Sequence, residues 1–251
     1  MAFVKIKDTN IYYLESNKEA DETILMLHGM FSNMAVFYLN IAPKLAEKYH
    51  IVLYDFKGHG MSDVAASGYD LRSMTEEMLE LIEKLHLKKV HITGYSFGGL
   101  IALYTLIHYP DIIGKAAIIE APNPDTEEHR TVQTYSRDLL LQKTMDSSSS
   151  TQLKPSNRKL NKLNAQIEFL LNKSTLQDDM RLFLNFFEEI PGSHISNETL
   201  LLYGNQSDCV DSGYFLHQSI KDSQLFIGEG DHNIPVQNSQ WITDKLVDFF
   251  F

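Results

Sequence analysis

A serine set between glycines, Gly94-Tyr95-Ser96-Phe97-Gly98, has the residue types and spacing of a catalytic nucleophile. An apolar run, Val90-His91-Ile92-Thr93, precedes it, and a helical segment from Leu100 to Tyr109 follows it. A Gly-x-Ser-x-Gly turn between strand and helix is typical of a nucleophile elbow, in which a tight, strained backbone lifts the serine hydroxyl clear of the sheet. A glycine-rich turn with an idle serine is the alternative, because five-residue patterns recur by chance.

A serine hydroxyl is a poor nucleophile until a base takes its proton, so the sequence must supply a base and an acid. His232 follows the last apolar run, Gln224-Leu225-Phe226-Ile227, and is the candidate base. Asp208 follows the apolar run Thr199-Leu200-Leu201-Leu202-Tyr203 and is the candidate acid that would fix the imidazole tautomer. The chain order Ser, Asp, His is the one expected for a nucleophile elbow of this type.

Three further residues are weaker candidates for these roles. Glu120 ends the apolar run Ala116-Ala117-Ile118-Ile119 and is the reserve candidate for the acid, with Asp211 behind it. His217 is the weaker candidate for the base, because it falls before the last predicted strand.

The oxyanion of an acyl-transfer intermediate needs two hydrogen-bond donors, and two backbone amides are candidates. The amide of Phe97 opens the helix after Ser96, and the amide of Met30 follows a sharp turn at Gly29. His28, before that glycine, is interpreted as a structural hydrogen-bonding residue. Asp55 and His59 are interpreted in the same way, because turns rich in Asp, Gly and Ser usually satisfy their own backbone. The candidate pocket residues are Phe31, Met34, Phe183 and Phe187, although the last two side chains would equally suit packing of a lid.

The apolar runs predict a doubly wound, mostly parallel α/β sheet. Residues 3–7 and 11–14 suit an antiparallel hairpin at one edge. Buried strands are expected at 23–27, 51–54, 90–93, 116–119, 199–203 and 224–227, with helices at 36–48, 73–86 and 100–109 and a closing helix at the end of the chain. The helix from Ser73 carries a capping box with Glu76.

Between residues 122 and 191 the strand pattern stops, and three helical segments are expected: 127–145, 157–173 and 175–190. We therefore predict a core domain formed by residues 1–121 and 192–251, with residues 122–191 as an inserted helical cap. Residues 152–174 carry five basic side chains and one acidic side chain. A solvated helix face explains this charge, and attraction of an anionic acyl group is the alternative.

Composition and apolar patterning limit the classes of binding partner and the cellular compartment that we expect. The net charge of −11 argues against nucleic acid or an anionic membrane as the main partner. No apolar run has the length of a signal peptide or of a membrane span, so a cytoplasmic protein is expected. The single cysteine, Cys209, excludes an intramolecular disulfide and a metal cluster built from cysteines, and it suits packing better than chemistry.

Taken together, these motifs resemble those of the α/β-hydrolase fold superfamily. The matching motifs are His28-Gly29, the run from Asp55 to Ser62, the run from Gly94 to Gly99, the Asp208 loop and Gly230-Asp231-His232. The resemblance implies an eight-stranded sheet, a cap after the sixth strand, a Ser-His-Asp triad and no cofactor. One departure concerns the acid, since Asp208 lies four residues after Gly204, where many relatives have three.

The predicted activity is that of a serine hydrolase. Ser96, His232 and Asp208 would cleave a carboxylic ester or thioester of a small or acyl-chain substrate through an acyl-enzyme. The basic cap stretch keeps a carrier-bound thioester open as a form of this substrate. A carbon–carbon bond hydrolase, a lactonase and an acyltransferase use the same residues, so the sequence does not separate them. A ligand receptor or signalling partner with incidental hydrolysis is the alternative from another class.

Overall fold

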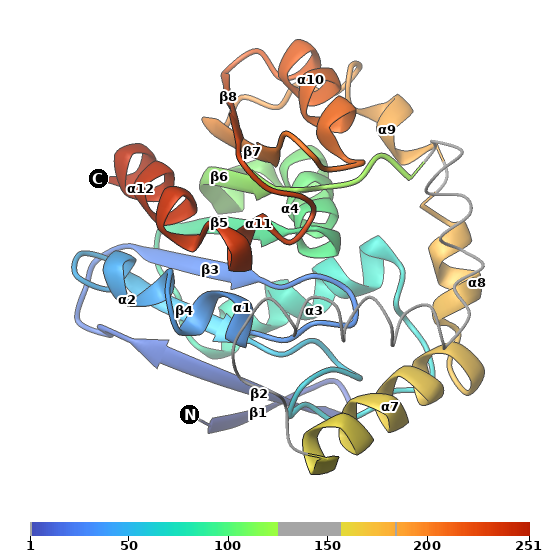
Figure 1. Ribbon diagram of the computed structural model, residues 1–251. Helices are drawn as coiled ribbons and strands as arrows, with labels where there is room; N and C mark the ends of the chain where they lie inside the picture. The colour runs from blue at the N-terminus through green and yellow to red at the C-terminus, as the bar shows by residue number, and fades with distance from the viewer. Residues whose placement is uncertain (1, 125–156, 184) are drawn as a thin grey trace.

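The computed structural model describes residues 2–124, 157–183 and 185–251. In these ranges eight strands form one sheet in the order β1-β2-β4-β3-β5-β6-β7-β8 (Figure 1). β1 and β2 pair antiparallel at one end, and β3 to β8 run parallel. The predicted mostly parallel α/β sheet is confirmed. The strands are β1 (Ala2–Ile6), β2 (Thr9–Ser16), β3 (Thr23–Leu27), β4 (His50–Tyr54), β5 (Val90–Tyr95), β6 (Ile113–Ile119), β7 (Thr199–Gly204) and β8 (Ser223–Gly228).

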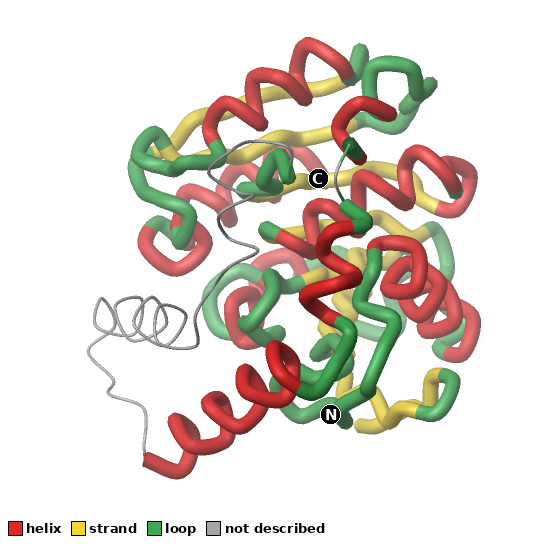
Figure 2. Tube along the Cα trace, turned by 90° about the vertical axis from the view of Figure 1, so that its right-hand side faces the viewer, coloured by secondary structure: helices red, strands yellow, loops and turns green. Residues whose placement is uncertain are grey.

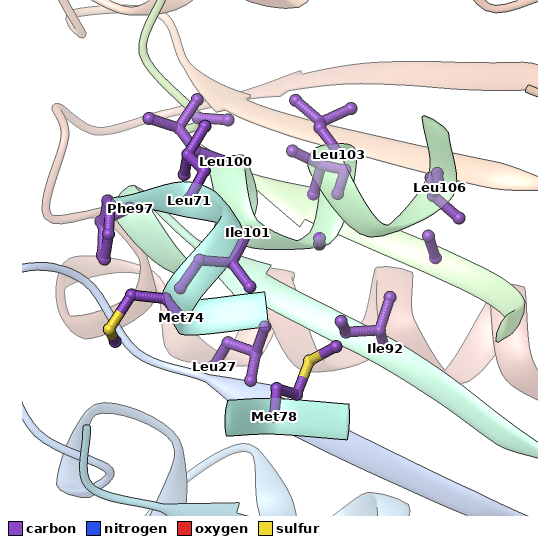
Figure 3. Packing of buried hydrophobic residues seen from close by; sticks show 14 of the residues in the cluster. Leu27, Leu71, Met74, Met78, Ile92, Phe97, Leu100, Ile101, Leu103 and Leu106 are labelled. Carbon is purple, nitrogen blue, oxygen red and sulfur yellow. The ribbon is translucent and has the colours of Figure 1, made fainter. Parts of the chain in front are cut away.

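Helices cover both faces of the sheet, because successive side chains of a buried strand point to opposite faces. Leu25 and Leu27 of β3 pack into one apolar cluster, whereas Ile24 and Met26 pack into a second. Figure 3 shows the first cluster, in which side chains of α3 and α4 meet Leu27 and Ile92. The helices outside the 157–191 region are α1 (Ala35–Tyr38), α2 (Ala42–Leu45), α3 (Leu71–Lys84), α4 (Phe97–His108), the 3-10 helix η1 (Pro110–Ile112), α10 (Val210–Ser219), α11 (Ile234–Gln237) and α12 (Ser239–Phe250).

Several predicted helix boundaries were wrong. The single helix expected at 36–48 is two short helices, and Pro43 lies in the first turn of the second. The cap of α3 is Asp70, whose carboxylate accepts a hydrogen bond from the amide of Ser73, so the helix starts earlier than the predicted Ser73 capping box. The loop expected between Asp208 and β8 contains α10, which the sequence reading missed.

Between β6 and β7 the described chain forms α7 (Asn157–Asn172), α8 (Leu176–Arg181) and α9 (Phe186–Glu189). The helix predicted at 157–173 is confirmed. The helix predicted at 175–190 is wrong, because it is split in two before Asn185, whose φ of +69° is left-handed. The helix predicted at 127–145 lies outside the described residues. None of the helices in the described ranges has the length and apolarity to cross a bilayer.

α7 and α8 lie beyond the carboxyl ends of the parallel strands, on the right of Figure 1, and α7 is the helix at the lower left of Figure 2. They contact the loop that follows β4. The amide of Gln166 donates to the carbonyl of Gly60, and the backbone amide of Thr175 donates to the carbonyl of Ala66. The carboxylate of Asp179 accepts from the amide of Tyr69 at 2.8 Å. These contacts fix the helices over the edge of the sheet where the candidate residues lie.

Candidate active site

Ser96 lies between β5 and α4 in a strained turn. Its φ of +53° and ψ of −116° are outside the regions that side chains normally adopt. The turn is crowded by backbone: a Cβ at Gly94 would lie 2.3 Å from the carbonyl oxygen of Gly98, and one at Gly98 would lie 2.3 Å from that of Leu27. The glycines at both positions are therefore required by close packing, as the nucleophile-elbow pattern predicted.

His232 faces Ser96 from the loop between β8 and α11. The Ser96 hydroxyl lies 3.0 Å from Nε2 of His232, within hydrogen-bond distance for proton transfer. The backbone carbonyl of His232 accepts a hydrogen bond at 3.0 Å from the hydroxyl of Tyr95, the residue before the serine. Tyr95 is buried, so it ties the histidine loop to the end of β5.

Glu120, not Asp208, contacts the other ring nitrogen of His232. Nδ1 of His232 lies 3.1 Å from Oε2 of Glu120, which follows β6 directly. Because a carboxylate accepts the hydrogen bond, Nδ1 carries the proton and Nε2 is left to accept from the Ser96 hydroxyl. The expectation that Asp208 contacts the histidine is wrong in this structure, and the reserve candidate occupies that place.

The Glu120 carboxylate is fully buried and held by three donors. Oε1 accepts from the backbone amide of Gly204 at 2.5 Å, and Oε2 accepts from the hydroxyl of Ser207 as well as from His232. The φ of Glu120 is +56°, a left-handed conformation that is unusual for a glutamate. Buried polar groups are normally paired, and here the pairing also fixes the carboxylate against the imidazole.

The register of the loop after β7 explains why Asp208 does not reach the histidine. Ser207 is the third residue after Gly204, at the spacing where the resemblance places the acid, and its side chain points inward to Glu120. Asp208 is the next residue and is exposed, with its Oδ1 3.6 Å from Sγ of Cys209. The structure therefore pairs an inward serine with a glutamate from the neighbouring strand.

The two remaining alternatives from the sequence lie away from Ser96. Asp211 is exposed in the first turn of α10. Nδ1 of His217 lies 2.9 Å from the hydroxyl of Ser223, and this contact is at the surface. Neither side chain contacts the serine or His232.

The two predicted oxyanion donors are the amides of Phe97, which follows Ser96, and of Met30, which follows Gly29. Gly29 packs against Ser96, since a Cβ at position 29 would lie 3.1 Å from Cβ of Ser96, and this brings Met30 next to the nucleophile. Within the described part of the chain, the amides of Met30 and Phe97 donate no hydrogen bond. The amide of Phe31 is different, because it donates to Nε2 of His59 at 3.0 Å. The Met30 and Phe97 amides therefore stay the predicted oxyanion donors.

The interpretation of His28 and His59 as structural residues is confirmed by their contacts. Nδ1 of His28 donates to the carbonyl of Gly29 at 2.7 Å, while its Nε2 accepts from the amide of Phe56 at 3.0 Å. His59 donates in the same way to the carbonyl of Lys57. Burial lowers the pKa of His28 to about 4 and that of His59 to about 3. Both rings are therefore neutral at neutral pH and hold the loop around Met30.

Asp55 is also structural, as expected. Its two carboxylate oxygens accept from the amides of Met34 and Met61, each at 2.8 Å. Burial raises the pKa of Asp55, although these two hydrogen bonds act in the opposite direction. The carboxylate joins the loop after β3 to the loop after β4.

The four candidate pocket residues lie in different surroundings. Phe183 stacks on Phe97 with ring centroids 5.5 Å apart, and Phe187 stacks on Phe215 at 5.6 Å. Phe31 has a φ of +59° and packs half-buried against the same apolar cluster. Met34 is buried in the second cluster, on the opposite face of the sheet from Phe97. Phe183 is therefore the candidate pocket residue whose ring contacts Phe97, the residue after Ser96.

The fold and this arrangement define an α/β-hydrolase, and the comparisons with known proteins agree. The family model described as "alpha/beta hydrolase fold" matches residues 22–249, so the chain belongs to this family. A putative carbamate hydrolase RutD of Stutzerimonas stutzeri is 32% identical over 117 residues, which cover 45% of this chain and 44% of that protein. The chain thus matches less than half the length of this relative.

Two other proteins match over nearly the whole chain. A 2-hydroxy-6-oxononadienedioate/2-hydroxy-6-oxononatrienedioate hydrolase 1 of Pseudomonas putida is 28% identical over 252 residues, covering 90% of this chain and 87% of that protein. Among solved structures, the esterase EaEST from Exiguobacterium antarcticum superposes with a TM-score of 0.72 at 25% identity, covering 98% of both chains.

Sequence reasoning missed three residues of the site. Ser207 and Tyr95 hold Glu120 and His232, and Cys209 places its Sγ 3.4 Å from Nδ1 of His232. The spacing of Ser207 from Gly204 was the available signal, because it matches the position at which relatives carry their acid. Nothing in the spacing of Tyr95 or Cys209 distinguishes them from packing residues.

Proposed function

We propose that this protein is a serine hydrolase that cleaves a carboxylic ester or thioester through an acyl-enzyme, with Ser96, His232 and Glu120 as its triad. The observation that carries the proposal is the continuous hydrogen-bonded line from the Ser96 hydroxyl through His232 to Glu120, with distances of 3.0 and 3.1 Å. The relatives named as hydrolases and as an esterase support the same reaction class.

The reaction begins when the Ser96 hydroxyl attacks the carbonyl carbon and Nε2 of His232 takes its proton. Glu120 holds the Nδ1 proton and stabilises the imidazolium. The amides of Met30 and Phe97 bind the oxyanion, and each such donor typically contributes about 3 to 4 kcal/mol to transition-state stabilisation. The tetrahedral intermediate then expels the alcohol or thiol, which receives the proton from His232. Water activated by the same histidine releases the acid from the acyl-enzyme.

We further propose that residues 122–191 form the cap over this site and select the acyl group. The stacked pair of Phe183 on Phe97 brings a ring of this segment onto the residue that follows the nucleophile. Such an aromatic surface suits an apolar acyl chain or a small aromatic ester. A carrier-bound thioester is included, because the basic residues of α7 lie in the same segment.

Labelling by a fluorophosphonate tests the nucleophile directly. Intact mass should increase by one adduct in the wild type and stay unchanged in Ser96→Ala, with circular dichroism confirming that both are folded. A folded wild type that takes no label would contradict the proposal and favour the ligand-receptor alternative. A panel of 4-nitrophenyl esters and acyl thioesters of graded chain length then measures which acyl groups are turned over.

A carbon–carbon bond hydrolase is the second candidate, because the Pseudomonas putida relative spans nearly the whole chain. Turnover of 2-hydroxy-6-oxononadienedioate, the compound in that relative's name, separates the two candidates. A kcat/KM for this compound far above that for every ester and thioester in the panel would assign the chain to carbon–carbon cleavage. The reverse order would support the ester or thioester reaction.

A further inference from the structure

Three side chains of types that bind metal ions lie close together at the candidate base, and they include the base itself. In the part of the chain that the structure describes, Cys209, Glu120 and His232 each offer one ligand atom to a single group, and these atoms all lie within 4.8 Å of one another. Cys209 and Glu120 are buried, whereas the His232 side chain is 34% exposed. The histidine therefore gives this buried group an approach from solvent.

Two of the three distances in this group are close to the ligand spacing of a tetrahedral zinc site. Zinc binds sulfur at about 2.3 Å and nitrogen or oxygen at about 2.0 to 2.2 Å, so tetrahedral angles place the sulfur about 3.6 Å from the nitrogen and the nitrogen about 3.4 Å from the oxygen. The observed distances are 3.4 Å between Cys209 Sγ and His232 Nδ1, and 3.1 Å between His232 Nδ1 and Glu120 Oε2. For these two pairs, shifts of a few tenths of an ångström would give the zinc spacing, and the third pair lies within 4.8 Å.

The charge and chemistry of the surroundings also favour a divalent, thiophilic cation. Thiolate, imidazole and carboxylate together are a ligand set that zinc prefers. Glu120 supplies one negative charge, and the exposed carboxylate of Asp208 lies 3.6 Å from the sulfur on the side facing solvent. A thiolate at Cys209 and the Glu120 carboxylate would neutralise the two charges of the ion, so the buried site would carry no net charge.

We propose that Cys209, Glu120 and His232 form a binding site for Zn²⁺ that switches the hydrolase off. On binding, the Cys209 thiol gives its proton to solvent and its sulfur bonds to the metal. Nδ1 of His232 bonds to the metal through its lone pair, and the proton that Nδ1 carried passes to Nε2. Nε2 is then an N–H donor toward Ser96 and cannot accept the serine proton, so the nucleophile loses its base. The binding step is independent of the proposed hydrolase function, whereas the inhibition rests on it.

Cobalt(II) tests the binding step without reference to activity. A thiolate bound to Co²⁺ gives a charge-transfer absorption in the near ultraviolet, which histidine and carboxylate ligands alone do not give. We expect this band in the wild type and in Ser96→Ala at one equivalent of Co²⁺, and its loss in Cys209→Ser and Cys209→Ala. Zn²⁺ should displace the cobalt and remove the band. A band that persists in folded cysteine variants, or is absent from the folded wild type, would overturn the site.

Inhibition is measured separately on the ester that the wild type hydrolyses best. Micromolar Zn²⁺ should lower the rate at least tenfold, and EDTA should restore it. In Cys209→Ser the Zn²⁺ concentration for half inhibition should rise by at least about 10- to 100-fold relative to the wild type, since loss of a group that only supports a metal ligand already costs this much affinity and Cys209 is a ligand itself. His217→Gln is the matched control, because it removes an exposed histidine away from the site. Zn²⁺ should inhibit this variant to the same extent as the wild type. Equal inhibition of wild type and Cys209→Ser would place the inhibitory zinc elsewhere. If binding is seen but no variant hydrolyses any ester, the hydrolase proposal fails while the metal site stands.

Discussion

Oε2 of Glu120 lies 3.1 Å from Nδ1 of His232, so the carboxylate that contacts this histidine comes from the end of β6 and not from the loop after β7. The two strands are parallel neighbours, with Ile119 paired to Leu202. Their carboxyl ends therefore lie side by side at the same edge of the sheet, and an acid following either strand could meet the histidine. In this chain the inward position after β7 is filled by Ser207, which hydrogen-bonds to Glu120.

The first prediction separates the two carboxylates. Glu120→Gln should lower kcat by about 10³- to 10⁴-fold, because the amide no longer fixes the tautomer or stabilises the imidazolium. Asp208→Asn should change kcat by no more than about twofold, since the side chain is exposed and does not contact His232. Both kcat values are measured on one 4-nitrophenyl ester, with thermal unfolding as the test of folding. A severe loss in Asp208→Asn with a mild one in Glu120→Gln would reverse the assignment.

The second prediction moves the acid to the neighbouring strand. The Ser207 hydroxyl contacts the carboxylate oxygen that holds His232, so an aspartate at 207 should reach the same nitrogen. We expect kcat of the double variant Glu120→Gln/Ser207→Asp to be at least tenfold higher than kcat of Glu120→Gln. The control is Glu120→Gln/Ser219→Asp, where the new carboxylate lies at the end of α10 and should recover nothing. A double variant at 120 and 207 no better than this control would show that the two positions are not interchangeable.

The third prediction concerns the close packing at the nucleophile turn. Gly98→Ala should destabilise the fold by roughly 2 to 4 kcal/mol, because its Cβ would meet backbone of β3 at 2.3 Å and backbone cannot move aside cheaply. Gly192→Ala is the matched control, since its Cβ would lie 3.9 Å from the carbonyl oxygen of Glu189, at an ordinary contact distance. Urea unfolding compares the free energies of unfolding. Equal stability of the two variants would contradict the crowding argument.

The fourth prediction is a loss of stability between pH 7 and pH 5. In the folded protein the pKa values are about 4 for His28 and about 3 for His59, whereas a histidine in an unfolded chain titrates at about 6.5. Below pH 6.5 the unfolded state therefore binds more protons than the folded state, and the free energy of unfolding falls as pH decreases. Each histidine adds to the slope of the free energy of unfolding against pH. This contribution approaches about 1.4 kcal/mol per pH unit at pH values well below 6.5 and above the pKa of the folded state.

The histidine variants isolate this contribution. Urea unfolding at pH 7.0, 6.0 and 5.0 should give a shallower pH dependence for His59→Gln than for the wild type, because one proton uptake is removed. His217→Gln, which replaces an exposed histidine, should keep the slope of the wild type. A slope in His59→Gln as steep as that of the wild type would mean that His59 is not buried in its neutral form.

Much of the fold follows from local sequence patterns. The central parallel strands are short apolar runs bounded by turn residues, because burial on both faces requires apolar side chains at nearly every position. All of the predicted runs are strands. Short or interrupted helices were predicted less well. The helices at 36–48 and 175–190 are broken where Pro43 and Asn185 set the backbone, and α10 was missed because its apolar side chains are too few to form a clear periodic stripe.

The sequence by itself determined the strained turn around Ser96, because Gly94, Ser96 and Gly98 satisfy a requirement that is local to five residues. It also determined that His232 follows the last strand. Only the tertiary structure decided which carboxylate contacts His232, because the choice between Glu120 and Asp208 depends on which side chain turns inward at the ends of two adjacent strands. That choice is made by a register difference of one residue, which places Ser207 inside and Asp208 in solvent. The same packing brings Cys209 to His232 from 23 positions away, a contact that no spacing in the sequence encodes.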